Sequence, residues 1–273
     1  MPVMDKVKIA ILGATGFTGL DLVLYLSKHP RAEIMYLCAS KNLGKSINFF
    51  DKRLSKKLPK ITSIKKINWS KLDLVFLSLP NGEAQKVIKN TFYTYKNLKY
   101  IDLSADFRIS NPNIYFENYK IKHKASELLK KSIYAISEFK KTLIQKYRIV
   151  ANPGCYPTSI QIPIIPLIKK NLIQLNDIVI DSKSGYSGAG KNFSKKFTHK
   201  NFWNSSFAYG VLSHRHVCEI DQEIKKQTKK KINYTFNPHL LPTFRGMLSS
   251  IYLKTRKNIS LKKIKSELEE YYK

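Results

Sequence analysis

The chain starts with a strand, a glycine-rich turn and a helix, and this unit constrains the fold most. Residues 6–12 first alternate between charged and apolar side chains and then become continuously apolar, as in a buried parallel strand. The next seven residues are GATGFTG. One apolar face then marks a helix that stops at His29-Pro30. Glycines in this context allow a tight turn and bring the backbone close to a pyrophosphate at the helix N-terminus. The unit therefore predicts dinucleotide binding, with a merely structural turn as the other interpretation.

Further buried-type strands follow at residues 33–39, 72–79 and 99–103, with a helical stretch at 83–89 and an irregular connection at 45–69. Strands that alternate with helices indicate a doubly wound parallel sheet of the Rossmann type, which binds ligands beyond the carboxyl ends of its strands. The segments 80–82 and 104–108 lie at such ends. Arg108 is either an ion-pair partner of Asp106 or an anion clamp, and we favour the clamp slightly.

The second predicted strand ends near Ser40 and Lys41. NAD enzymes place an acidic residue at about this distance for the ribose hydroxyls, whereas this chain offers a hydroxyl and a cation. That substitution favours the 2′-phosphate of NADP over NAD. The alternative is an exposed Ser-Lys pair in a lysine-rich chain.

A second key stretch is ANPGCYPTS, which follows a strand-like run that ends at Val150. A cysteine at the start of a helix has its thiolate stabilised by unpaired N–H groups and the helix dipole, so Cys155 is a candidate nucleophile. A buried structural cysteine in a Pro-Gly loop is the other interpretation, because free cysteine commonly behaves as a small apolar residue.

The segment after the cysteine predicts a buried helix at 160–172, a strand at 177–182 and a flexible donor-rich loop at 184–191 that ends in Lys191. This loop suits a phosphate or carboxylate, although its spacing does not match a P-loop. Residues 192–209 suggest either a substrate-covering loop or a plain surface excursion. Residues 246–254 predict a long strand, and Ser260 is expected to cap a final helix.

The sequence HRHVCEI is expected to open a helix that continues to about Lys229. Two residues that are two positions apart on a helix face different ways, so at most one of His214 and His216 should point at the cysteine. Such a histidine takes up and returns a proton, while Glu219 orients it or pairs with Arg215. Metal binding is disfavoured because no further ligand cluster is nearby.

The 273 residues carry a net charge of +30, which raises the question of a nucleic-acid or anionic-surface partner. Only seven of the 49 basic residues are arginines, and the lysines are scattered with no basic tail or helix. We therefore favour compositional drift over specific nucleic-acid binding, with attraction of anionic substrates as a by-product.

The cysteines Cys38, Cys155 and Cys218 are odd in number and far apart, which argues against a disulfide framework or zinc cluster and fits a reducing cytosol. The most apolar run, residues 160–168, is short and contains two prolines, so no membrane span is expected.

A nicotinamide site, a thiolate and a histidine base are together the groups needed to convert an acyl derivative to an aldehyde through a thioester.

Six ordered motifs, GATGFTG, LSADFR, NPGCYPT, SGYSGAGK, HRHVCEI and PHLLPTFRG, cover nearly the whole chain. In this order they resemble the N-acetyl-gamma-glutamyl-phosphate reductase family, the NADPH-dependent step of arginine biosynthesis. The resemblance implies a cytoplasmic homo-oligomer with a Rossmann domain at 1–150 and a catalytic α/β domain at 151–273, like that of glyceraldehyde-3-phosphate and aspartate-semialdehyde dehydrogenases. It also leads us to expect that the chain is short at its C-terminus, since family members continue past the position of Lys273.

The resemblance implies that Cys155 attacks the acyl phosphate and that His216 is the acid and base. The implied substrate-binding residues are Arg108, Lys191, His214, Arg245 and Glu219. The candidate cofactor-binding residues are Gly13, Thr15, Gly16, Phe17, Thr18, Ser40, Lys41, Pro80 and Gly188. The alternatives are a sister reductase of aspartyl or aminoadipyl phosphate and an inactive binding or regulatory relative.

Overall fold

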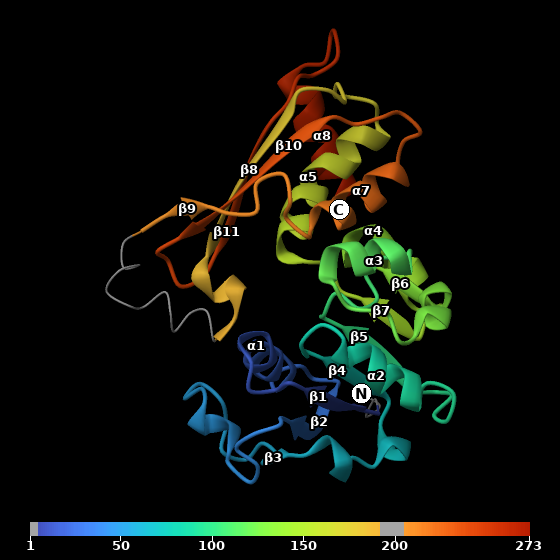
Figure 1. Cartoon of the computed structure of the whole chain (residues 1–273), viewed down its shortest axis with the longest axis vertical. Helices are drawn as coiled ribbons and strands as arrows, with labels where there is room; N and C mark the ends of the chain where they lie inside the picture. Colours follow the sequence, from blue (N-terminus) through green and yellow to red (C-terminus); the bar gives the residue numbers. More distant parts are fainter. Residues whose placement is uncertain (1–4, 192–204) are drawn as a thin grey trace. The chain divides into compact units, whose positions relative to one another are not determined.

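The computed structural model describes residues 5–191 and 205–273, and the chain divides into two compact units, Met1–Asn152 and Pro153–Lys273 (Figure 1). Each unit has its own sheet and its own buried apolar clusters. The two are described separately below.

The first unit is a parallel sheet in the order β3-β2-β1-β4-β5-β7-β6. Its strands are β1 (Val7–Leu12), β2 (Ala32–Cys38), β3 (Ile61–Thr62), β4 (Leu74–Leu77), β5 (Lys99–Asp102), β6 (Ser132–Tyr134) and β7 (Ile149–Ala151). The chain runs outward from β1 to β3 and then returns to β4 on the other side of β1. The carboxyl ends of β1 and β4 therefore form the switch point at which doubly wound sheets bind ligands.

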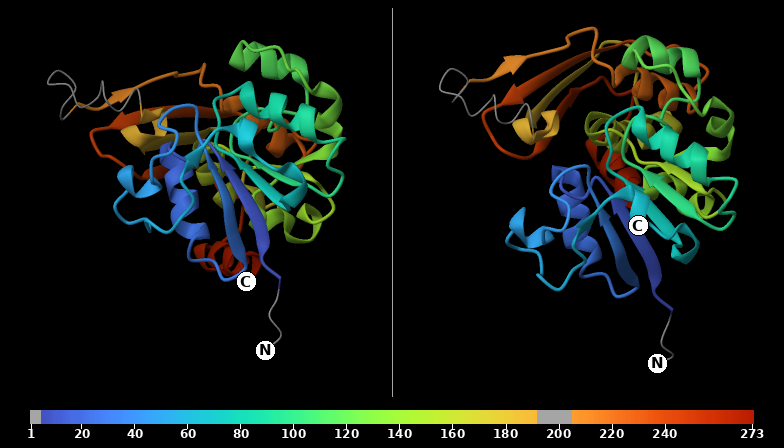
Figure 2. Two further views of the ribbon diagram at one scale, coloured as in Figure 1. Left: turned by 90° about the horizontal axis from the view of Figure 1, so that it is seen from below. Right: turned by 60° about the horizontal axis from the view of Figure 1, so that its bottom comes forward.

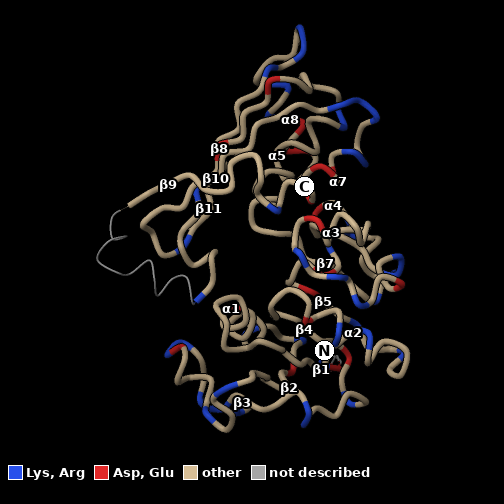
Figure 3. Tube along the Cα trace, viewed as in Figure 1, with Lys and Arg blue, Asp and Glu red and all other residues tan. Residues whose placement is uncertain are grey.

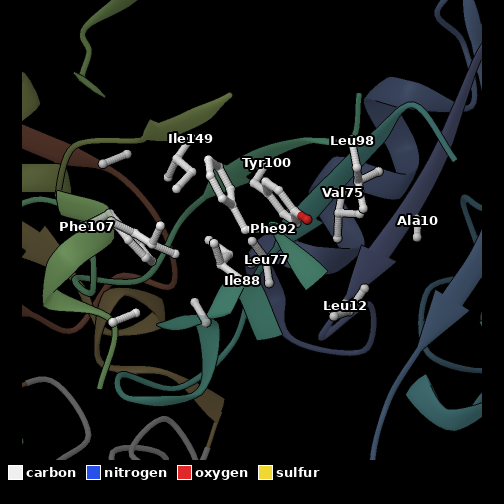
Figure 4. Close-up of a cluster of buried hydrophobic side chains, with 14 of the residues drawn as sticks. Ala10, Leu12, Val75, Leu77, Ile88, Phe92, Leu98, Tyr100, Phe107 and Ile149 are labelled. Carbon is white, nitrogen blue, oxygen red and sulfur yellow. The ribbon is translucent and has the colours of Figure 1, made fainter. Parts of the chain in front are cut away.

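Four α-helices connect these strands: α1 (Phe17–Leu26), α2 (Glu83–Thr91), α3 (Pro112–Tyr119) and α4 (Ser137–Ile144). Short 3-10 helices lie at Ile47–Phe49, Ile64–Lys66, Trp69–Lys71 and Ser126–Lys131. In one of the apolar clusters of this unit, side chains of β4 and β5 pack with Ile88 and Phe92 at the end of α2 (Figure 4). The strands of this sheet are apolar along their length because both faces of the sheet are covered.

The second unit is a mixed sheet in the order β11-β8-β10-β9, formed by β8 (Ile178–Gly185), β9 (Phe207–Ala208), β10 (Tyr234–Leu241) and β11 (Met247–Tyr252). Strands β8, β10 and β11 run side by side, as the additional views in Figure 2 show. Helix α5 (Cys155–Lys169) packs on this sheet and contacts α7 (Val217–Lys225) and α8 (Leu261–Tyr271). The apolar side chains of α5 and β8 meet in one buried cluster.

Prolines interrupt the hydrogen bonding of α5 and create a site for the last helix. Pro166 has no N–H, so it cannot bond the carbonyl of Ile162 one turn earlier. The hydroxyl of Tyr272, at the end of α8, donates to this Ile162 carbonyl. Lys170 and Glu267 add an ion pair between the same two helices, with 3.0 Å between Nζ and Oε2. The C-terminal helix is thereby fastened to the helix that begins at Cys155.

Replacing Tyr272 by phenylalanine is expected to lower the free energy of unfolding by about 1 kcal/mol, because the Ile162 carbonyl loses its donor. Urea unfolding followed by circular dichroism measures the difference. Tyr271→Phe is the matched control, since the Tyr271 hydroxyl meets the exposed ammonium of Lys169, at 2.9 Å, and not a main-chain carbonyl of α5 in that bond. Equal losses in the two variants would contradict the role assigned to Tyr272.

Several sequence predictions about individual elements need correction. The helix expected at 160–172 begins at Cys155, because proline is tolerated in a first helical turn, where the N–H groups are unpaired anyway. The flexible loop expected at 184–191 is the end of β8 followed by a 3-10 helix at Tyr186–Ala189. The helix expected to run from HRHVCEI to Lys229 is α7, which starts only at Val217 and ends at Lys225. Ser260 does cap α8, since its hydroxyl accepts the N–H of Lys263 at 3.2 Å.

Lysines and arginines are spread along both units (Figure 3). Within the described residues, no helix is long and apolar enough to cross a membrane. The proposed substrate-covering segment at 192–209 lies mostly outside the described residues.

Candidate active site

Cys155 is the first residue of helix α5, and Gly154 is the residue that caps it. The carbonyl of Gly154 accepts the N–H of Thr158 at 2.9 Å and the Thr158 hydroxyl at 2.8 Å, which fixes the first turn. The side chain of Cys155 is exposed, whereas Tyr156 beside it is buried. A thiol at this position meets the positive end of the helix dipole and is open to a substrate.

His216 and Glu219 stand next to this cysteine. The Glu219 carboxylate is completely buried and accepts two hydrogen bonds, from Nδ1 of His216 at 2.5 Å and from the N–H of Gly154 at 3.0 Å. The other ring nitrogen of His216 is left for its hydrogen bond with the Cys155 side chain. One carboxylate therefore joins the histidine motif to the cysteine turn and orients the imidazole toward the sulfur.

Two opposing effects set the charge of His216. Burial on its own lowers the pKa of this imidazole, but the Glu219 carboxylate and the hydrogen bond with Cys155 more than offset it, and the pKa rises above its ordinary value. A raised pKa makes the imidazole a better acceptor for the proton of the neighbouring thiol, which it can later return. The arrangement is that of a base positioned by a carboxylate.

The two histidines of HRH precede α7, so the helical reason for expecting them to face different ways is wrong, although His216 does bond Cys155 as one of the pair was expected to. His216 precedes α7, and its N–H donates to Nδ1 of His214 at 3.2 Å. The two rings stack with centroids 5.1 Å apart and planes at 30°. His216 bonds Cys155, and His214 lies behind it against the rings of Tyr156, Tyr209 and Phe236.

Tyr156 links the cysteine turn to the sheet, a function that the sequence reasoning missed. Its hydroxyl donates to the carbonyl of His239 on β10 at 3.2 Å and accepts the Tyr209 hydroxyl at 3.0 Å. It also bonds the hydroxyl of Ser184 on β8. An aromatic residue directly after a helix-start cysteine is the only sequence signal for this anchor, and its partners are more than 25 residues away.

The motif segments SGYSGAGK and PTFRG lie side by side. The N–H groups of Gly185, Tyr186 and Ser187 donate at 2.9 to 3.0 Å to carbonyls of residues 243–246. A Cβ at Gly185 would stand 2.8 Å from the backbone of Arg245, so only glycine fits there. This pairing places Arg245 beside the segment that leads to Lys191 and Gly188, whose ligand-binding functions stay predictions.

In the first unit, two of the three turn glycines serve the packing of the chain itself. Gly13 has φ of +80°, and a Cβ there would stand 2.0 Å from the Ser78 carbonyl oxygen, while one at Gly19 would stand 2.2 Å from the Gly13 oxygen. Gly16 caps α1, and a Cβ there would meet only the Gly13 oxygen, at 3.3 Å. The N-cap residue of α1 is a glycine and supplies no side-chain acceptor, so this helix N-terminus suits a pyrophosphate.

Ser40 and Lys41 are exposed and follow β2, the neighbour of β1. The Cys38 carbonyl at the end of β2 accepts the N–H groups of Gly13 and Ala14 at 2.9 and 3.0 Å. This pair of hydrogen bonds ties the end of β2 to the glycine turn, so the fold keeps the Ser-Lys pair close to the predicted cofactor site. Thr15, Phe17 and Thr18 lie at the turn and at the start of α1.

The segment at 104–108 contacts the start of α2, which begins after Pro80-Asn81-Gly82. The carboxylate of Asp106 accepts the N–H groups of Gly82 and Gln85 at 2.7 and 3.0 Å, and the Asn81 side chain accepts the N–H of Ala105 at 3.1 Å. Arg108 reaches two main-chain carbonyls, those of Asn152 and Leu103, each at 2.8 Å. Its guanidinium group thus supports the chain just before Pro153.

Asp102 is a completely buried carboxyl at the end of β5. Its oxygens accept the N–H groups of Ser104 at 2.9 Å and Phe107 at 3.3 Å. Burial, and then the charge of Asp106, raise the pKa of Asp102 to about 7. In the unfolded chain the pKa of an aspartate is about 3.9. The contribution of protonated Asp102 to the stability of the fold is therefore fully present below that pH and is lost as the pH rises through about 7.

We therefore expect the chain to lose stability between pH 5 and pH 8, and Asp102→Asn to remove part of that loss. Thermal midpoints of both proteins at the two pH values measure the effect. At pH 8 the thermal midpoint of the variant should be higher than that of the parent, because the asparagine has no charge to bury. Parallel pH profiles would contradict a titrating Asp102.

Comparison with known proteins places this arrangement in a class. Residues 8–147 match the family described as semialdehyde dehydrogenase, NAD binding domain, and residues 155–273 match semialdehyde dehydrogenase, dimerisation domain. An aspartate semialdehyde dehydrogenase II of Vibrio cholerae has the same fold, with a TM-score of 0.72, 16% identity, and coverage of 98% of this chain and 80% of that chain. The protein is thus an oxidoreductase homologue of the semialdehyde dehydrogenase class with an NAD(P)-binding domain.

The chain belongs to the N-acetyl-gamma-glutamyl-phosphate reductase family. The reductase of Afipia carboxidovorans is 40% identical over 271 residues, which are 98% of this chain and 77% of that protein. The reductase of Rhodospirillum rubrum is 40% identical over 253 residues, 92% of this chain and 72% of that protein. A chloroplastic relative from Arabidopsis thaliana is 40% identical over 267 residues, which are 97% of this chain and 66% of that protein.

Proposed function

We propose that the protein is an NADPH-dependent reductase that converts N-acetyl-glutamyl 5-phosphate into N-acetyl-glutamate 5-semialdehyde and inorganic phosphate. The observation that carries this proposal is the shared Glu219 carboxylate, which bonds both His216 and the Gly154 N–H beside Cys155. A thiol, an oriented imidazole and a buried carboxylate in this order form an activated nucleophile.

In the proposed reaction, His216 takes the thiol proton and the Cys155 sulfur attacks the acyl carbon. The bond from that carbon to the phosphate oxygen breaks, phosphate leaves, and a thioester remains on Cys155. After reduction, the carbon–sulfur bond breaks, the aldehyde leaves and Cys155 returns as the thiolate. Throughout these steps His216 holds the proton needed by the oxygen or the sulfur, and Glu219 stabilises its charged form.

A nicotinamide cofactor, when bound, supplies the hydride. The residues that suit it are the turn at Gly13, Thr15 and Gly16 with the start of α1, where the backbone N–H groups of the first helical turn would bind a pyrophosphate. Ser40 and Lys41 suit a 2′-phosphate, which supports NADP over NAD. Phe17, Thr18, Pro80 and Gly188 complete the proposed cofactor contacts.

Arg108, Lys191 and Arg245 are proposed to bind the phosphate and carboxylate groups of the substrate. Arginine binds such groups through paired hydrogen bonds, and lysine as a point charge. Arg245 is already stacked on Phe244, with its guanidinium carbon 5.1 Å from the ring centroid, which restricts its orientation. The net charge of +30 adds attraction for an anionic substrate.

The test is the reaction in reverse. N-acetyl-glutamate semialdehyde, phosphate and NADP are mixed with the chain, and reduced cofactor is followed at neutral to alkaline pH. We expect turnover that requires phosphate and prefers NADP to NAD. Aspartate semialdehyde in a parallel reaction separates the sister reductase, and turnover of that substrate alone would overturn the assignment. The absence of turnover with either semialdehyde would favour an inactive binding relative.

A homo-oligomer is proposed from the dimerisation-domain match and from the sheet of the second unit. Val179, Leu248 and Tyr252 lie on one face of β8 and β11 and are 39%, 63% and 62% exposed. A second copy of the chain that covers this face would bury these apolar side chains.

A further inference from the structure

His214 is held in one protonation state by the main chain next to it. Its Nδ1 lies 3.2 Å from the backbone nitrogen of His216 and accepts that N–H. A ring nitrogen that accepts a hydrogen bond carries no proton, so the His214 ring is neutral, with its proton on Nε2. An imidazolium at this position would place two donors against each other.

The surroundings of His214 favour the same state. The rings of Tyr156, Tyr209 and Phe236 contact it edge to face, with centroids 5.3, 5.4 and 5.6 Å away. Burial first, and then the positive charges of His216 and Arg215, lower the pKa of His214 to about 4. The two neighbouring histidines therefore differ, because His216 faces Glu219 and His214 faces aromatic rings.

We propose that His214 is a positioning residue for His216 and not a ligand of the substrate's anionic groups. Its Nδ1 fixes the backbone of His216, and its ring stacks on the His216 imidazole, so that a ring nitrogen of His216 stays directed at Cys155. The proposal extends the proposed function, and it replaces the substrate-binding role that the family resemblance implied for His214. A neutral ring with Nδ1 occupied is a poor partner for a phosphate compared with arginine or lysine.

The first experiment needs no substrate. The rate of alkylation of Cys155 by iodoacetamide is measured from pH 5 to 9, with the Cys155 peptide quantified by mass spectrometry. Burial raises the pKa values of Cys38 and Cys218 to about 12, so both should react slowly. The charged groups that act on His216 are Glu219 and Cys155, while the charge of Arg215 acts on His214, and all three are unchanged in every variant.

Two variants separate the contacts of His214. His214→Asn keeps an acceptor near the Nδ1 position, and we expect alkylation within threefold of the parent with the same pH midpoint. His214→Phe keeps a ring but leaves the His216 N–H without its acceptor, and we expect a rate about tenfold lower with a displaced midpoint. Parental behaviour of His214→Phe would overturn the proposal. If that variant does not fold, His214→Leu takes its place with the same expectation.

Turnover gives a second, independent readout. In His214→Phe we expect kcat to fall about tenfold while KM for phosphate stays within twofold. A KM for phosphate that rises tenfold with unchanged alkylation would identify His214 as an anion ligand and overturn the proposal. If the parent protein shows no turnover, the proposed function fails while the alkylation result still decides the role of His214.

Discussion

Replacing Cys155 by serine is expected to lower kcat of the reverse reaction by ~10⁴-fold or more, because removing a nucleophile from a cooperating set of catalytic groups costs about this much. Serine keeps the size and helix position of residue 155, but its hydroxyl is far less acidic than a thiol. His216, positioned for a sulfur, cannot make the hydroxyl comparably nucleophilic. Steady-state rates with saturating phosphate and NADP measure the change.

Cys218→Ser is the matched control for this prediction. Cys218 lies on α7 one residue before Glu219, and its sulfur donates to the carbonyl of Arg215 at 2.9 Å. Burial and the charge of Glu219 raise the pKa of this thiol to about 12, so it stays protonated and unreactive. We expect activity within threefold of the parent. Undiminished turnover in Cys155→Ser would exclude the thioester route.

The second large effect is expected for Glu219→Gln. The N–H of Gly154 and Nδ1 of His216 both donate to the carboxylate. An amide of the same shape accepts from one of them and turns its own NH₂ toward the other. The imidazole then loses its orientation toward Cys155, and we expect kcat to fall by about 10³-fold, on the scale seen when the orienting carboxylate of a catalytic triad is made neutral.

Stability should respond to the same substitution in a pH-dependent way. The raised pKa of His216 means that its charged form stabilises the fold below the unfolded value of about 6.5, and that this contribution is lost as the pH rises through the folded value. The stability lost in Glu219→Gln is therefore expected to be larger at pH 6 than at pH 9 in urea unfolding.

Glu223→Gln is the control, one turn further along α7. Glu223 is buried and pairs with Lys226 on the same helix, with 2.5 Å between Oε1 and Nζ. We expect its kcat within threefold of the parent. Equal losses of activity in the two variants would mean that any buried charge on α7 matters and that Glu219 has no special function.

The periodic parts of the chain could be predicted well. The apolar runs at the start predicted strands within one or two residues of β1, β2 and β5, because buried parallel strands leave a continuous apolar signal. Elements between residues 110 and 145, such as α3 and α4, were missed because they are short and lack a clear period. The helix of Cys155 was placed five residues late, since its prolines masked a first turn that tolerates them.

The sequence alone determined that Cys155 stands at a helix start after a Pro-Gly turn and that a glycine turn follows the first strand, because both features depend on neighbours along the chain. Only the tertiary structure decided which histidine bonds the cysteine, that Glu219 bonds both His216 and Gly154, and that His214 is neutral behind them. The bonds of His216 to Cys155 and of Glu219 to Gly154 join residues 61 and 65 positions apart. Their geometry follows from how α5, α7 and the sheet pack together, which no local pattern of residues encodes.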